Sequence, residues 1–289
     1  MTSADKNAWN VWCQSRHDEL AGADSWLGLA GLFWLETEHG GRNAVGSAAD
    51  VAVVLPDGPP WLGEIVVAED GALRWESAGI VGTDAVLLDE QAVSAKSGVG
   101  SEFLHVALRS DEGGAPSVLG FGALRFFVIR RDGRFAVRVK NRQWAATRPF
   151  LGLDYFPFAA EWIVDADWQA LAVPQQLEVP SVTGDLQRVD ITHRAVFQHE
   201  GVAVELLPLS IDATGVFFVF RDRTSGKTSY GGGRFLRAAL PKQGKLKLDF
   251  NRAYNPPCAF SPFATCPLPP PENWLGLAIE AGEKRYAGH

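Results

Sequence analysis

The order of apolar and polar residues at the start of the chain predicts one helix followed by a buried segment. The apolar residues of this helix recur at near-helical spacing, and they are Ala8, Trp9, Trp12, Cys13 and Leu20. Gly22 follows them and can end the helix. Residues 25–35 are nearly all apolar, which fits either a buried strand or a short buried helix, because periodicity alone does not separate the two.

From about residue 50 the pattern changes to short apolar runs separated by turn residues. The expected strands are 51–55, 61–67, 72–76, 85–89, 103–109, 119–131, 134–140, 160–166, 187–197, 202–209, 215–222, 228–237, 245–251 and 275–280. This spacing predicts a mainly β protein, an antiparallel barrel or sandwich with an N-terminal helical cap. We expect a single domain over 1–289, in which residues 1–47 pack on a β core formed by 48–289.

A favoured two-residue turn at Asp132-Gly133 sets the register of one hairpin. Counting back from the turn, Phe127 lies across from Arg138, and both faces of the hairpin are apolar near its middle. Leaving one partner of a buried ion pair without the other costs about 3–5 kcal/mol. Arg138 therefore either pairs with an internal carboxylate or faces a cavity and meets an anionic ligand.

A turn at Ser225-Gly226 predicts a second hairpin, in which Asp222 faces Ser229. Three glycines, 231–233, follow in the returning strand and precede Arg234. Glycines in a strand mark either a bulge that curves the sheet or a close approach by a backbone or ligand. Their unhindered amides beside an arginine also suit an anion.

Composition narrows the function classes. The chain has 289 residues and a net charge of −7, from 27 basic and 34 acidic residues, which disfavours a nucleic-acid binder. No apolar run is long enough to span a bilayer, and the N-terminus has no apolar signal core, so we expect neither a membrane protein nor secretion. Three cysteines are too few for a disulfide framework and suit a reducing, cytoplasmic location.

Common catalytic and metal signatures do not fit this sequence. Residues 225–228 echo the end of a phosphate-binding loop, but Arg221 stands where the motif needs glycine. The serine-hydrolase elbow and the zinc-protease motif do not occur. Cys258 and Cys266 match no common zinc spacing, so we expect no metal site, although these cysteines with a histidine remain a metal-dependent alternative.

The most unusual stretch begins at a strand that brings Asp249 and Asn251 to one face. Prolines then prevent regular structure, and such irregular segments serve either as a structural clasp or as the wall of a site. Tyr254 and Asn255 can donate and accept hydrogen bonds. Cys258 is either a nucleophile, if a cation such as Arg252 stabilises its thiolate, or a small buried apolar side chain.

Several motifs together resemble a bacterial uncharacterised family, domain of unknown function 1684. The matching stretches are 26–35, 136–140, 150–153, 222–226, 230–236, 249–260, 264–273 and 281–284. The family pattern tends to place Asp after the Arg-Val-Lys run, whereas this chain has Asn141 there, which puts in doubt any role that needs a carboxylate. The resemblance implies relatives and brings no activity, substrate or cofactor with it.

Two functional hypotheses follow from the residues. In the first, a polar site binds a small anionic molecule, and hydrolysis or isomerisation is the leading reaction if the protein is an enzyme. Its catalytic candidates are Asp249, Tyr254 and Cys258, and its ligand-binding candidates are Arg138, Asp222, Ser225, Tyr230, Arg234, Asn251 and Asn255. In the second, the protein is a non-catalytic binding or interaction protein whose Asn-Pro-Pro-Cys loop is a structural clasp.

Overall fold

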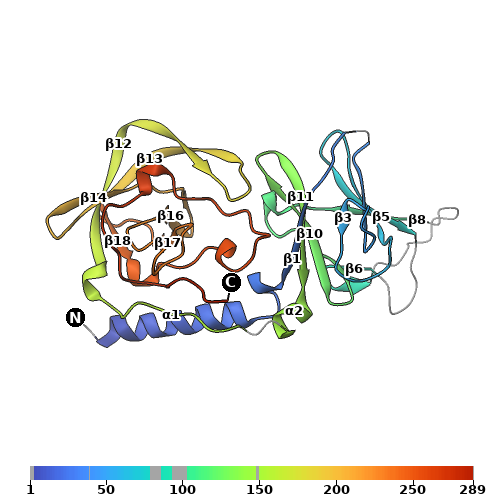
Figure 1. Ribbon diagram of the computed structural model, residues 1–289. Coiled ribbons are helices and arrows are strands. Elements are labelled where there is room, and N and C mark those ends of the chain that lie inside the picture. Colours follow the sequence, from blue (N-terminus) through green and yellow to red (C-terminus); the bar gives the residue numbers. More distant parts are fainter. Residues whose placement is uncertain (1–2, 39, 79–85, 93–102, 148–149, 289) are drawn as a thin grey trace. The chain divides into compact units, whose positions relative to one another are not determined.

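The computed structural model describes residues 3–38, 40–78, 86–92, 103–147 and 150–288, which belong to two compact units (Figure 1). The larger unit combines residues 1–21 with 150–289, and the smaller unit comprises 22–149. Position 85 of the expected strand 85–89 lies outside the described residues. The expectation of one domain, with 1–47 packed on 48–289, stays a prediction.

The smaller unit consists of two sheets that share one apolar core. The sheets run in the orders β1-β11-β10-β9-β6-β7 and β3-β2-β4-β5-β8. Its strands are β1 (Leu29–Trp34), β2 (Arg42–Gly46), β3 (Val53–Val54), β4 (Gly63–Val67), β5 (Leu73–Ala78), β6 (Leu87–Leu88), β7 (Gln91–Ala92), β8 (Phe103–Leu108), β9 (Leu119–Phe121), β10 (Leu124–Arg131) and β11 (Arg134–Asn141). Trp75 on β5 and Phe126 on β10 are fully buried in the same cluster, which therefore draws on both sheets.

The smaller unit also contains short helices. They are η1 (Trp26–Gly28), η2 (Asp111–Gly113) and α2 (Arg142–Thr147). The apolar stretch 25–35 thus contains both structures that its pattern allowed, since η1 leads directly into β1.

The β10–β11 hairpin confirms the register predicted from its turn. Phe127 pairs with Arg138, and Arg131 pairs with Arg134 across the turn. Asp132 and Gly133 both have positive φ, at 48° and 78°, which is the backbone geometry that matches the twist of the flanking strands. Arg138 is buried on β11, a strand that pairs with β10 at one edge and with β1 at the other.

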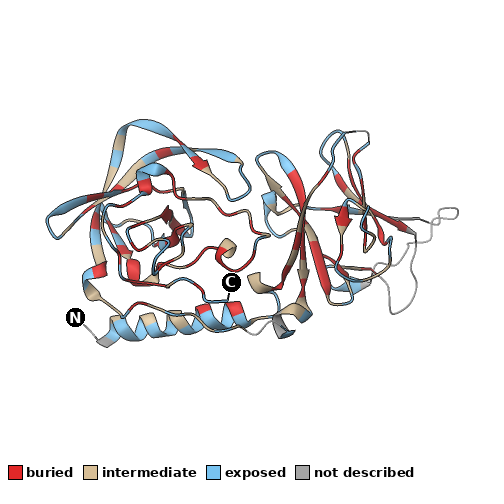
Figure 2. Cartoon of the chain, viewed as in Figure 1, coloured by how far each residue is buried: buried red, intermediate tan, exposed pale blue. Residues whose placement is uncertain are grey.

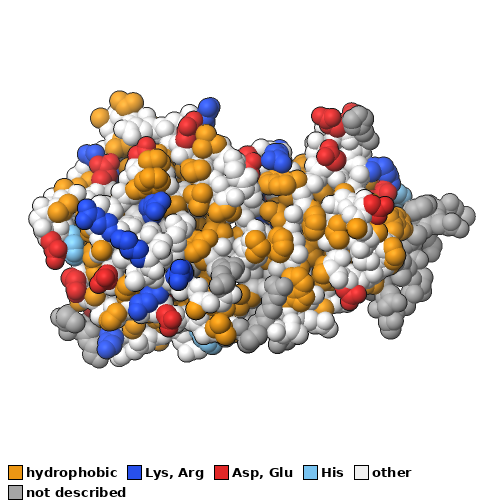
Figure 3. Space-filling model, viewed as in Figure 1, with side chains coloured by type: hydrophobic (Ala, Val, Ile, Leu, Met, Phe, Trp, Pro, Cys, Tyr) orange, Lys and Arg blue, Asp and Glu red, His pale blue; other side chains and the backbone are white. Residues whose placement is uncertain are grey.

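The larger unit contains two antiparallel sheets, in the orders β14-β13-β12-β18 and β15-β16-β17. The strands are β12 (Ile163–Pro180), β13 (Leu186–His199), β14 (Val202–Leu206), β15 (Ser210–Asp212), β16 (Gly215–Phe220), β17 (Arg234–Ala238) and β18 (Lys245–Asp249). Phe218, Phe220 and Phe250 are fully buried in a core that both sheets share. Figure 2 shows exposed residues along much of the long β12–β13 ribbon, and Figure 3 shows acidic and basic side chains interspersed on one face of this unit.

The N-terminal helix α1 (Ser3–Ala21) belongs to the larger unit and confirms the predicted helical cap. Leu20 is fully buried, and the Trp9 indole Nε1 donates a 3.0 Å hydrogen bond to the carbonyl of Asn251. The rings of Trp9 and Trp12 both meet the edge of Tyr155, at centroid distances of 6.0 and 6.1 Å. The prediction of a mainly antiparallel β protein with an N-terminal helix is confirmed.

Two predicted elements were wrong. The hairpin turn at Ser225-Gly226 does not exist as a tight turn, because β16 ends at Phe220 and pairs there with Arg234, the first residue of β17. The chain leaves the ladder after Phe220 because the Asp222 side chain caps a turn and binds Arg234, so Asp222 and Ser229 are not ladder partners.

The predicted strand 275–280 is irregular backbone. Two backbone hydrogen bonds join it to the segment that follows β16. The amide of Leu275 donates to the carbonyl of Arg221, and the amide of Arg223 donates to the carbonyl of Leu277. The Arg234 guanidinium donates hydrogen bonds to the carbonyls of Ile279 and Ala281, so these carbonyls do not accept from the backbone of a neighbouring strand. The last connections are the 3-10 turns η3 (Ala160–Trp162), η4 (Phe250–Arg252), η5 (Pro257–Ala259) and η6 (Pro271–Asn273).

Among the described residues, no helix has the length and apolar character needed to cross a membrane.

Candidate functional site

Arg234 and Asp222 form a sealed ion pair in the core of the larger unit. Their side chains are 1% and 0% exposed, and Arg234 Nη2 lies 2.5 Å from Asp222 Oδ2. The same guanidinium donates to the carbonyls of Ile279, at 2.9 Å, and of Ala281, and it lies 5.3 Å from the ring centre of Phe220. Burial lowers the pKa of Arg234, and the Asp222 carboxylate opposes this effect. The guanidinium therefore already binds partners within the protein.

Asp222 also organises the loop that follows it. Its Oδ1 accepts hydrogen bonds from the Thr224 amide at 2.7 Å and from the Thr224 hydroxyl at 2.5 Å. The Ser225 hydroxyl accepts from the Asp222 amide at 3.1 Å, and Thr224 and Ser229 join their hydroxyls at 2.7 Å. Asp222 and Ser225, two of the predicted ligand-binding residues, therefore hold the chain reversal between β16 and β17.

Asp249 and Asn251 contact each other through a 3-10 turn and not on one strand face as predicted, because β18 ends at Asp249 and Asn251 lies in η4. Asp249 caps η4, and its Oδ1 accepts from the amide and the side chain of Asn251 at 3.1 and 3.0 Å. Asn251, 1% exposed, binds both backbone groups of Ala159 at 2.9 Å. Arg252 Nε lies 3.3 Å from Asp249 Oδ2. The cluster joins the end of β18 to the segment before β12.

The Tyr254-Asn255 pair meets a buried carboxylate that sequence reasoning did not single out as a site residue. Glu283 is fully buried; its Oε1 accepts from Arg16 Nε at 2.9 Å and its Oε2 from the Asn255 amide at 2.7 Å. The Asn255 side chain donates to the carbonyl of Lys284 at 2.8 Å, and Arg16 lies 4.8 Å from the ring centre of Tyr254. Burial raises the pKa of Glu283, although Arg16 favours its ionised form. This network connects α1 to the segments that carry Asn255 and Glu283.

Tyr230 and Cys258 also come together. The Tyr230 hydroxyl donates to the carbonyl of Cys258 at 3.1 Å, and the Cys258 amide donates to the Cys266 sulfur at 3.3 Å. A hydrogen bond with the Cys266 thiol lowers the pKa of Cys258 against the opposing effect of burial, and the Tyr230 hydroxyl adds to the lowering. The predicted help from Arg252 is replaced by a neighbouring thiol and a phenol.

Arg138, the remaining candidate, lies in the smaller unit. Its guanidinium carbon lies 5.5 Å from the ring centre of Trp26. Whether it meets an internal carboxylate or an anionic ligand stays a prediction. The candidates of the larger unit thus gather in separate polar clusters.

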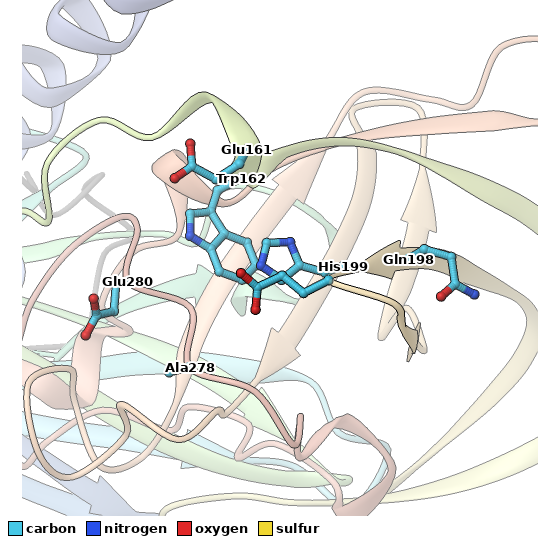
Figure 4. A pocket seen from close by; sticks show the side chains of 7 residues that line it. Glu161, Trp162, Gln198, His199, Ala278 and Glu280 are labelled. Atoms are coloured by element: carbon cyan, nitrogen blue, oxygen red, sulfur yellow. The ribbon is translucent and has the colours of Figure 1, made fainter.

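A hollow in the larger unit includes residues that the sequence analysis did not propose as a site. It has a volume of about 650 Å³ and is lined by Glu161, Trp162, Gln198, His199, Glu200, Ala278 and Glu280. The rings of Trp162 and His199 stack with their centres 4.0 Å apart and their planes at 18°. Figure 4 shows this stack between Glu161 and the segment that carries Ala278 and Glu280.

Three separate segments build this hollow: η3, the end of β13 with its turn, and the irregular segment before Ala281. Trp162 is held by the core, because its edge meets Phe250 at a centroid distance of 5.9 Å. His199 follows as the last residue of β13, where Glu200 begins the turn with a positive φ of 49°. No group of three or more metal-ligating side chains occurs in the described part of the chain.

The family comparison concerns mainly the larger unit. The model of a family described as "Protein of unknown function (DUF1684)" matches residues 148–284. An uncharacterized protein of Haloarcula marismortui, solved by solution NMR, is 33% identical over 48% of this chain and 80% of that chain, with a TM-score of 0.40. Among curated proteins, none matches this sequence.

Proposed function

We propose that this chain, which belongs to the DUF1684 family of proteins of unknown function, binds a small cationic molecule in the hollow of its larger unit. The lining of the hollow carries this proposal. Three glutamates and a stacked Trp162–His199 pair line it, and no lysine or arginine is among its described lining residues. Its volume of about 650 Å³ lies in the range of small-molecule sites.

The chemistry of the lining selects the charge of the ligand. Glu161 and Glu280 are exposed, so their carboxylates keep their charge accessible to a ligand from solvent. The Trp162 ring is 6% exposed and stacks on the half-buried His199, so the stack offers a ligand mainly its imidazole side as a flat wall for the carbon skeleton of an amine or guanidinium compound. An anion would meet like charges here, which disfavours its binding.

This proposal changes the predicted ligand from an anion to a cation. The anionic site and its hydrolysis or isomerisation depended on Arg138, Arg234 and Asp249 as accessible groups. Arg234 is 1% exposed and bound to Asp222, and Asp249 caps η4, so two of these groups already have partners in the protein. We retain the binding of a small molecule and propose no reaction for the hollow.

The clasp hypothesis is a second candidate that a specific observation favours. The Asn255 amide and side chain bind Glu283 and Lys284, and the buried Pro256 follows directly. We propose that the Asn-Pro-Pro-Cys loop serves the fold by fastening the C-terminal segment beside α1. This role is compatible with ligand binding at the hollow.

Thermal unfolding and calorimetric titration of the full chain test the binding proposal. The probes are spermidine, agmatine and choline as cations, with glutamate and inorganic phosphate as anions. We expect at least one cation to raise Tm and the anions to leave it unchanged. Binding should weaken toward 1 M salt, where the Debye length falls to about 3 Å.

A matched pair of variants locates the site. Glu280→Gln should weaken the affinity for the cation about two- to fivefold, the effect of one exposed charge pair. Glu272→Gln removes an exposed glutamate that does not line the hollow and should leave the affinity unchanged. Equal affinities of the two variants, or stabilisation by the anions alone, would overturn the proposal.

A further inference from the structure

Cys258 and Cys266 lie against each other in the larger unit, apart from the lining residues of the hollow. Cys258 is in η5, and Cys266 follows after a proline-containing loop. Cys266 belongs to a small apolar cluster with Val219, Phe235 and Ala264, and Cys258 packs against this cluster. Both cysteines carry thiols in this structure.

The geometry brings the two sulfurs within reach of each other. The Cys266 sulfur accepts the backbone amide of Cys258 at 3.3 Å. Only three bonds separate that nitrogen from the sulfur of Cys258. A disulfide can form only between cysteines held this close, so the backbone has already brought the pair together.

The two thiols differ in exposure in the way that an exchange site needs. Cys258 is half-buried, whereas Cys266 is 4% exposed. A small disulfide molecule from solvent therefore meets Cys258 first, and Cys266 is positioned behind it to complete the reaction.

The environment favours the thiolate at Cys258 and disfavours it at Cys13, the remaining cysteine. Hydrogen bonding by Cys266, and further by Tyr230, lowers the pKa of Cys258, whereas burial raises that of Cys13 to about 11. Burial, together with the nearby Cys258, raises the pKa of Tyr230, so this phenol keeps its proton and remains a donor. Thiolate, and not thiol, is the attacking species in exchange.

We propose that Cys258 and Cys266 form a thiol–disulfide exchange site that reduces a low-molecular-weight disulfide, with Cys258 as the attacking thiol and Cys266 as the resolving thiol. Tyr230 acts as a positioning residue that holds Cys258 through its carbonyl at 3.1 Å. The site is independent of the cation-binding hollow, so either proposal can fail without the other.

Cys258 loses its proton, and its thiolate attacks one sulfur of the disulfide RSSR; that S–S bond breaks, and RS⁻ leaves and takes up a proton. Cys266 then loses its proton and attacks the Cys258 sulfur, which releases the second RS⁻, and this thiolate is protonated in turn. Two electrons pass from the protein sulfurs to RSSR, which becomes two RSH, while the protein gains one intramolecular disulfide.

Intact-mass analysis of the reduced full chain after incubation with oxidised glutathione tests the proposal. The wild-type chain should lose two hydrogens, and peptide mapping should join Cys258 to Cys266. Cys266→Ser should stop at the mixed disulfide and gain one glutathione on Cys258. Cys13→Ser is the matched control and should behave like the wild type.

Alkylation kinetics of the wild-type chain provide a readout that needs no variant to fold. Burial raises the pKa of Cys13 from 9.0, the value of an ordinary thiol, to about 11, and the pKa of Cys258 lies below that ordinary value. The thiolate fraction then favours Cys258 by at least about 100-fold, and the lower nucleophilicity of the more acidic thiol reduces the rate advantage to about tenfold. We expect iodoacetamide to modify Cys258 about tenfold faster than Cys13, and Tyr230→Phe to shift the pH profile of Cys258 upward.

Distinct outcomes would overturn the exchange site. Glutathione attached to Cys13 in preference to Cys258, equal alkylation rates at the two positions, or a wild-type chain that keeps both thiols under excess oxidised glutathione would each contradict it. An unchanged pH profile in Tyr230→Phe would remove the positioning role of Tyr230 alone.

Discussion

Two regions of the larger unit use charged side chains in opposite ways. Around Arg234 and Asp222 the two charged side chains are at most 1% exposed and are held by partners inside the protein. Around the hollow, Glu161, Glu200 and Glu280 are exposed beside the Trp162–His199 stack. The closed network has the residue types that suggest anion binding, yet its groups bind one another. The open hollow has accessible charge, so it is the region that can accept a ligand.

The difference shows that residue type alone does not separate a site from a scaffold. A buried ion pair contributes to the fold chiefly because removing one partner leaves the other charge without compensation. An exposed carboxylate contributes little to stability and keeps its charge for another molecule. The comparison can therefore be tested by measuring unfolding free energies in the two regions.

The largest effect is expected from Arg234→Met. This substitution removes the cation from the fully buried Asp222 and the donors from the carbonyls of Ile279 and Ala281. We expect a loss of about 3–5 kcal/mol in the free energy of unfolding, measured in urea. Adding Asp222→Asn to Arg234→Met should recover part of this loss, because no uncompensated charge then remains buried.

Arg237→Met supplies the matched control on the same strand. Arg237 is exposed, and its guanidinium lies 4.9 Å from the ring centre of Phe217. Its loss should cost about 0.5–1 kcal/mol, the value of an exposed cation–π contact. If both arginine variants lost equally little stability, the closed network would not be the structural element described above.

A pH dependence of intermediate size is expected from Glu283. Burial raises its pKa in the folded chain above the value near 4.3 of an unfolded glutamate. In the pH range between these two values the folded state binds more protons than the unfolded state, so the contribution of Glu283 to stability is full below about pH 4.3 and falls as pH rises. The stability difference between wild type and Glu283→Gln should decrease by up to about 1.4 kcal/mol per pH unit in this range.

Urea unfolding across a pH series measures this slope. The exposed Glu272, replaced by Gln, is the control and should leave the slope as in the wild type. A difference between wild type and Glu283→Gln that grows with pH would show that Arg16 and the Asn255 amide outweigh burial at this carboxylate.

Sequence patterns that involve only neighbouring residues, such as turn dipeptides and residue alternation, predicted the local parts of this fold. The Asp132-Gly133 turn and the alternation around it were enough for the β10–β11 register, because both strands follow directly from the turn. The reversal after Phe220 was missed because it depends on Asp222 and Arg234, which are distant in sequence from Ile279 and Ala281. A turn dipeptide carries no information about such a long-range ion pair.

The same division between local patterns and long-range contacts applies to the site residues. Cys258 and Tyr230 were singled out by residue type, but the contact between Cys258 and Cys266 could not be deduced from a spacing of eight. The hollow combines segments near positions 162, 199 and 280, none of which carries a sequence motif. The sequence analysis proposed none of its lining residues as a site, because an exposed glutamate or a stacked ring has no local pattern that distinguishes it.

The smallest effect is expected from neutralising the hollow with Glu161→Gln, Glu200→Gln and Glu280→Gln together. Like charges around one hollow repel each other, so their removal should raise the unfolding free energy slightly, by less than about 0.5 kcal/mol per site. The gain should vanish in 1 M salt, where screening removes the repulsion. Glu205→Gln should have the opposite effect, because Glu205 Oε2 lies 2.9 Å from Arg194 Nη1. Loss of this exposed ion pair should lower the unfolding free energy by a similarly small amount. If the triple variant instead lost several kcal/mol, these carboxylates would have partners that support the fold, and the hollow would belong with the closed network around Arg234.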